Sequence, residues 1–96
     1  MAADIQAILK KSENQLNEWK ESWHDKYLEW ICGYANAQGG TLYIGIDDDG
    51  NMANLEPTVA KKLLEDIPNK ITSSLGITCD VNLHYRKKKP YIEIPV

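Results

Sequence analysis

The spacing of apolar residues changes at Gly76 from a helical period to a strand period, and this change constrains the fold most. Before Gly76, apolar residues recur at near-helical spacing, namely Val59, Leu63, Ile67, Ile71 and Leu75. After it they alternate, and one face carries Ile77, Cys79, Val81, Leu83 and Tyr85. A turn at residues 87–90 then leads into a second alternating run at residues 91–96. The pattern predicts a long helix followed by a β-hairpin.

Pro68 lies inside the predicted long helix. Proline has no N–H to donate, and its ring crowds the preceding helical turn. We therefore expect a kink at Pro68 or a break into two shorter helices.

The first half of the chain predicts a strand, a helix and a second strand. Residues 14–20 alternate loosely, and residues 27–35 carry an apolar stripe at helical spacing. Gly39-Gly40 can end that helix, because glycine tolerates the left-handed conformation found after helix C-termini. The second strand, residues 41–47, would place three apolar side chains on one face: Leu42, Ile44 and Ile46. A short helix at residues 3–11 would precede these elements.

The predicted order is thus a short N-terminal helix followed by β-α-β-α-β-β. This order favours the α+β class, with a four-stranded sheet and helices packed on one of its faces. A length of 96 residues predicts a single domain over residues 1–96. Because the chain stops on a core strand, we expect it to be the N-terminal fragment of a longer protein. The aromatic residues expected to fill the core are Trp19, Trp30 and Tyr34.

The charge is unevenly distributed along the chain. The formal net charge is −3, with four basic against eight acidic residues in positions 1–48 and seven against six in positions 49–96. Dedicated DNA-binding domains are usually basic overall, so any nucleic-acid surface here must be local. Cys32 and Cys79 form no metal-type pair, which indicates reduced thiols and a cytoplasmic location. No apolar run approaches the roughly 20 residues of a membrane span.

Three short motifs resemble the pattern of the Schlafen AlbA-type domain. That pattern is a glutamate, an E-F-K strand, a helix ending A-F-A-N-T-x-G-G and a strand ending G-V-D-D-x-G. This chain has Glu13, then Glu18-Trp19-Lys20, then the segments Tyr34–Gly40 and Thr41–Gly50. The resemblance covers about 40 residues well and implies a DNA-binding module of bacterial transcriptional regulators. It also implies alternatives, because some members are described as helicase-related or divergent ATP-binding proteins.

A nuclease is a second function implied by the resemblance. Eukaryotic Schlafen proteins carry a related core that resembles a metal-dependent RNA nuclease with three carboxylates. The positions that match the three carboxylates are Glu13, Glu18 and either Asp47 or Asp48. For a metal site we expect Glu13, Glu18 and Asp48 to hold Mg²⁺ or Mn²⁺. Lys20, on the face of Glu18, would stabilise charge on the phosphate. The simpler interpretation is that these acids are solvated and that Asp48 helps to form a turn.

Arg86-Lys87-Lys88-Lys89 is the one basic cluster in the sequence. It falls at the predicted hairpin tip between Tyr85 and Tyr91, where cations can reach phosphates and rings can stack on unpaired bases. Alba-type chromatin proteins, which the predicted element order resembles, also present a basic hairpin to DNA. The alternative is a solvated turn whose lysines protect a sheet edge.

We predict a nucleic-acid-binding module, DNA-directed, that belongs to a transcriptional regulator and requires no cofactor. Its phosphate contacts would come from Lys20, Arg86, Lys87, Lys88 and Lys89. The metal-dependent nuclease is one alternative, and an ATP-binding or homodimerising module is another.

Overall fold

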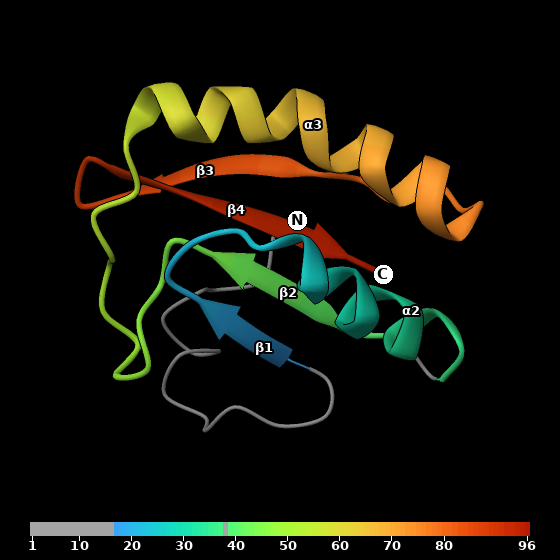
Figure 1. The fold of residues 1–96 in the computed structure, drawn as a ribbon. Coiled ribbons are helices and arrows are strands. Elements are labelled where there is room, and N and C mark those ends of the chain that lie inside the picture. Colours follow the sequence, from blue (N-terminus) through green and yellow to red (C-terminus); the bar gives the residue numbers. More distant parts are fainter. Residues whose placement is uncertain (1–16, 38) are drawn as a thin grey trace.

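The computed structural model describes residues 17–37 and 39–96, which form a four-stranded sheet with two α-helices (Figure 1). Three elements come from the first half of the predicted order: strand β1 (Asn17–Lys20), helix α2 (Leu28–Ala35) and strand β2 (Thr41–Ile44). A short 3₁₀ helix, η1 (Asp25–Tyr27), leads into α2. Then follow helix α3 (Pro57–Leu75) and strands β3 (Asn82–Arg86) and β4 (Lys89–Pro95). The predicted α+β class is confirmed, whereas the helix expected at residues 3–11 lies outside the described residues.

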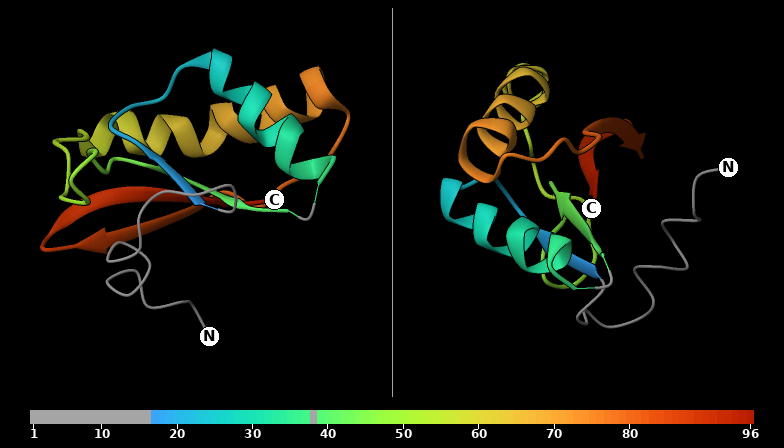
Figure 2. Two further views of the ribbon diagram at one scale, coloured as in Figure 1. Left: turned by 90° about the horizontal axis from the view of Figure 1, so that it is seen from below. Right: turned by 90° about the vertical axis from the view of Figure 1, so that its right-hand side faces the viewer.

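The sheet is mixed and has the strand order β1-β2-β4-β3. β1 and β2 are parallel, while β4 is antiparallel to both β2 and β3. Both α-helices lie on the same side of this sheet, as Figure 2 shows. The described part of the chain contains no helix long and apolar enough to cross a membrane.

Two groups of buried side chains hold the sheet. On the helix side, Ile31 of α2 and Ile67 of α3 pack with strand residues that include Leu42, Ile44 and Ile92. On the opposite side lies a second cluster, made of Trp19, Tyr43, Ile46 and Tyr91. The predicted burial of Trp19 and Tyr34 is confirmed. The prediction for Trp30 was wrong, because its side chain is 40% exposed on α2.

Gly45 reverses the alternation of β2, so Ile46 does not share a face with Leu42 and Ile44. Its backbone has φ +103°, and the N–H groups of Gly45 and Ile46 both donate to the carbonyl oxygen of Lys20. Two residues facing one partner are the mark of a β-bulge. The bulge turns Ile46 into the cluster opposite the helices. The prediction of a regular strand to residue 47 was wrong for this reason.

Pro68 does not break α3, which runs without interruption from Pro57 to Leu75. Of the two alternatives expected at Pro68, a kink or a break, the break into two shorter helices was therefore wrong. Leu63, Ile67 and Ile71 are buried on one side of the helix, both before and after Pro68, and they pack in the helix-side core. Burial of such side chains contributes about 1.5–3 kcal/mol each, which offsets the roughly 3 kcal/mol that an interior proline costs.

Strand β3 is shorter than the alternating run that predicted it, since it begins at Asn82 rather than at residue 77. Its partner β4 ends at Pro95, which has no N–H to donate to a longer ladder. Ile77, Cys79 and Val81 still pack against the helix-side core. The alternation of apolar residues therefore predicts their burial correctly, but it predicts a longer strand than the structure has.

Candidate nucleic-acid interface

The hairpin between β3 and β4 turns through two lysines. Arg86 pairs with Lys89 across the strands, so only Lys87 and Lys88 form the loop. Their φ angles are 53° and 65°, which is the left-handed region that two-residue hairpin loops of type I′ require. Such loops favour Asn-Gly, because a side chain with a Cβ is strained there. Both lysines are exposed.

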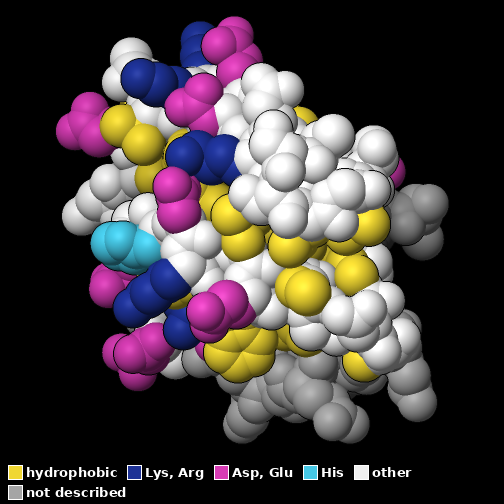
Figure 3. All heavy atoms as spheres, turned by 45° about the vertical axis from the view of Figure 1, so that its right-hand side comes forward, with side chains coloured by type: hydrophobic (Ala, Val, Ile, Leu, Met, Phe, Trp, Pro, Cys, Tyr) yellow, Lys and Arg dark blue, Asp and Glu magenta, His cyan; other side chains and the backbone are white. Residues whose placement is uncertain are grey.

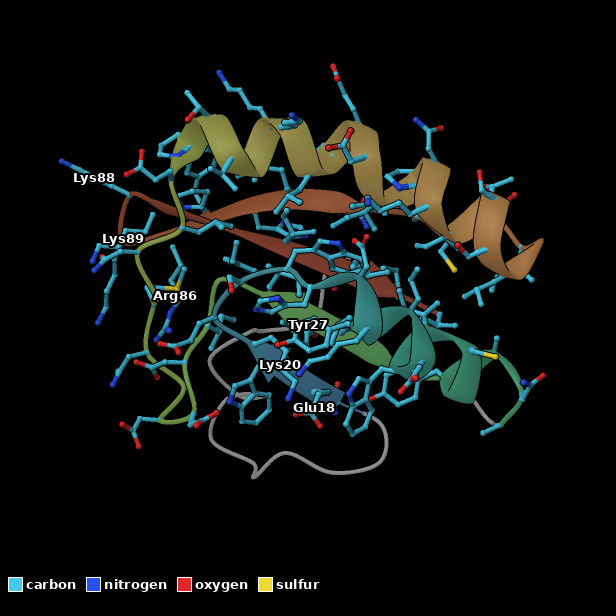
Figure 4. All side chains as sticks on the ribbon, in the orientation of Figure 1. Glu18, Lys20, Tyr27, Arg86, Lys88 and Lys89 are labelled. Carbon is cyan, nitrogen blue, oxygen red and sulfur yellow. The ribbon has the colours of Figure 1, made fainter. Side chains whose placement is uncertain are left out.

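Arg86 and Lys89 contact the loop that follows β2. Arg86 Nη1 donates to the carbonyl oxygen of Gly50 at 3.4 Å, and Lys89 Nζ donates to Oδ1 of Asn54 at 3.0 Å. These contacts hold the hairpin against residues 47–54. Figure 4 shows Arg86 and Lys89 directed toward this loop while Lys88 extends away from the molecule. The four predicted cations therefore divide into an anchoring pair and a tip pair.

The two tyrosines that flank the basic cluster lie on opposite sides of the hairpin. Tyr85 is 58% exposed, whereas Tyr91 is buried and stacks on the ring of His84, with centroids 5.3 Å apart. His84 Nε2 lies 3.0 Å from Oε1 of Glu93. Burial raises the pKa of Tyr91 above its ordinary value, and the nearby Glu93 carboxylate adds to this. Only Tyr85 is placed to meet a ligand from solvent.

Lys20 is separated from the hairpin. It points to the helix side of β1, where its Nζ lies 3.4 Å from Oε1 of Glu18 and 5.4 Å from the centre of the Tyr27 ring. The Trp30 ring lies at 5.7 Å from the same nitrogen. Figure 4 shows Lys20, Glu18 and Tyr27 together, away from Arg86, Lys88 and Lys89. The Lys20 ammonium thus sits in a cation–π environment. The sequence analysis missed this environment, although Tyr27 and Trp30 both lie in the apolar helical stripe predicted for residues 27–35.

Two of the carboxylates considered for a metal site, Glu18 and Asp47, have other partners in the described residues. β1 and β2 pair, yet Asp47 Oδ1 accepts the N–H groups of Asp49 and Asn51, both at 2.9 Å. Glu18 lies beside Lys20, and Glu13 lies outside the described residues. Within residues 17–37 and 39–96, no group of three Asp, Glu, His or Cys side chains could hold a metal ion. Taken alone, these residues do not fit a three-carboxylate centre.

Charge is mixed on one face of the molecule. On the face drawn in Figure 3, Lys and Arg side chains alternate with Asp and Glu rather than forming one basic field. This distribution agrees with the overall charge of −3. The basic hairpin is therefore a local feature, as the sequence analysis required.

A helix-covered mixed sheet that ends in a basic hairpin defines a small α+β module with a local cationic arm. The family description "Schlafen, AlbA_2" matches residues 13–96, and the chain belongs to this family. Membership suggests a nucleic-acid-related function. None of the curated proteins matches the chain.

The fold also resembles that of a solved protein. The crystal structure of the DIP2311 protein from Corynebacterium diphtheriae superposes with a TM-score of 0.67 at 18% sequence identity. The match covers 96% of this chain and 21% of that protein, so the chain spans about a fifth of its length. At this identity the likeness shows a shared fold.

Proposed function

We propose that this domain binds DNA through the tip of the β3–β4 hairpin, as the DNA-contacting module of a transcriptional regulator. The observation that carries the proposal is a pair of exposed lysines in a loop that needs left-handed backbone at both positions. Asn-Gly would serve folding better at these positions. Strained residues are often retained where they serve a function, and here the function would be charge.

The four cations of the hairpin make different contacts and therefore have different roles. Arg86 and Lys89 hold the arm against residues 47–54, while Lys87 and Lys88 remain available to phosphate oxygens. Each neutralised phosphate releases counterions, which lowers the logarithm of affinity by about 0.9 for each tenfold rise in salt. Two tip lysines therefore predict a slope of about −1.8, whereas four phosphate contacts would give about −3.6.

Charge reversal at the tip tests the proposal. Fluorescence anisotropy with a labelled duplex, over a range of salt concentrations, would compare the wild-type domain with the K87E/K88E variant. We expect the variant to lose measurable binding, because like charges then face the phosphates. The matched control is K61E/K62E, which reverses two other adjacent exposed lysines, on α3, and should change affinity little. Equal affinity of the wild type and K87E/K88E would refute the proposal.

The metal-dependent nuclease stays a hypothesis that the same material can test. Adding Mn²⁺ to the duplex and to a structured RNA, and following strand integrity, would detect cleavage. Cleavage that is lost in Glu18→Gln would show that the functional site is a nuclease site at the carboxylates, rather than the hairpin. Intact strands with salt-sensitive binding favour the DNA-binding module.

A further inference from the structure

We propose that Tyr85 is a stacking platform for an unpaired base, so the hairpin prefers single-stranded DNA to duplex DNA. The inference rests on the proposed function, because Lys87 and Lys88 would hold the phosphates beside that base. It adds the physical form of the DNA, which charge alone does not specify.

Exposure singles out Tyr85 among the large apolar side chains of the described residues. It is 58% exposed, compared with 46% for Val59 and 40% for Trp30. An exposed ring beside charged residues can stack on a base while the charges meet the phosphates, so Tyr85 is a candidate contact residue. Tyr91, the other tyrosine that flanks the cluster, is buried against His84 and cannot take this role.

Tyr85 lies two residues after Leu83, on the helix-side face of β3, and its ring nevertheless stays exposed. β3 is the outermost strand of the order β1-β2-β4-β3, so no described strand covers its outer edge. Across the ladder, Tyr85 is paired with Pro90, which is buried. The Tyr85 ring therefore has a buried residue, Pro90, as its cross-strand neighbour, and it is also exposed to solvent.

The tip lysines lie at a useful distance from this ring. Lys87 follows Tyr85 by two residues, which is about 7 Å along an extended chain. A base stacked on Tyr85 would thus have its own or the next phosphate within reach of a lysine side chain. Grooves that bind single strands combine the same two elements, namely cations that follow the backbone and rings that stack on bases.

Duplex DNA offers no such partner for Tyr85. Its base faces are covered by neighbouring base pairs, and only edges and phosphates are accessible. It also carries more charge per unit length than a single strand, so purely electrostatic binding would favour the duplex. Preference for the single strand therefore requires stacking, which makes the preference itself diagnostic.

The test compares a labelled oligothymidine with a duplex of equal length, by anisotropy at one moderate salt concentration. We expect the wild type to bind the single strand more tightly. Tyr85→Leu, which keeps apolar bulk but has no aromatic face, should weaken single-strand binding about tenfold and leave duplex binding unchanged. Tyr85→Trp should retain the preference, since indole also stacks. Trp30→Leu is the matched control, an exposed aromatic removed from α2, and should change neither affinity.

Failure of this inference and failure of the proposed function give different results. If Tyr85→Leu binds the single strand as the wild type does, or if the wild type prefers the duplex, stacking by Tyr85 is refuted. K87E/K88E would still abolish binding in that case, and the DNA-binding function would stand. If K87E/K88E binds both DNAs normally, the hairpin is not the interface and both proposals fall.

Discussion

At the scale of single residues, Gly45 and Gly33 show how much the surroundings of a glycine matter. Gly45 forms the bulge of β2 at φ +103°, and a Cβ there would lie 3.1 Å from the carbonyl oxygen of Pro90 and 3.3 Å from Leu55 Cδ2. Gly33 lies inside α2, and a Cβ there would meet nothing within 4 Å. The same substitution should therefore have opposite effects at the two positions.

We predict that Gly45→Ala lowers the free energy of unfolding by about 1–3 kcal/mol, through backbone strain and crowding. Gly33→Ala should raise it by about 0.5–1 kcal/mol, because alanine favours the helix. Urea unfolding followed by circular dichroism measures both changes. Equal effects of the two variants would contradict the bulge at Gly45.

At the scale of elements, the two lysines of the hairpin loop are expected to favour DNA binding while lowering the stability of the fold. Lys87 and Lys88 occupy left-handed backbone, for which Asn-Gly is the favoured pair. The double variant K87N/K88G should raise the free energy of unfolding by about 1 kcal/mol, because relief of strain outweighs glycine's extra entropy in the unfolded chain. It should also weaken DNA binding, since both tip charges are lost. A variant that is more stable and binds normally would show that the loop is only a solvated turn.

Across the whole molecule, local sequence patterns predicted the elements and their buried faces, but they did not predict the contacts between distant segments. The hairpin, the basic cluster at its tip and the helix-side burial of Ile67 and Ile71 follow from hydrophobic period and turn position. The environment of Lys20 did not, because the two aromatic rings that approach it, Tyr27 of η1 and Trp30 of α2, come seven and ten residues later in the chain. The anchoring of Arg86 on Gly50 likewise joins residues 36 positions apart. Such contacts depend on packing, which period and propensity do not encode.

The burial of Tyr43, on the sheet face opposite the helices, links the stability of the whole molecule to alkaline pH. Burial, together with the negative charge of its cross-strand neighbour Glu93, raises the pKa of Tyr43 from 10.0 to about 12. The folded chain therefore keeps this proton at pH values where the unfolded chain releases it. The resulting stability is complete below pH 10 and is lost as the pH rises toward 12.

Urea unfolding of the wild type and Tyr43→Phe, between pH 8 and pH 11.5, tests this link. The wild type should lose stability steadily above pH 10, and Tyr43→Phe, which has no phenolic proton, should lose less over the same range. Some dependence should remain in the variant, because the pKa of Tyr91 is also raised. Tyr85→Phe is the matched control, since it removes an exposed phenol and should leave the wild-type profile unchanged. Parallel pH profiles for the wild type and Tyr43→Phe would mean that the Tyr43 hydroxyl meets solvent, and the packing on this face of the sheet would then have to be looser than the structure has it.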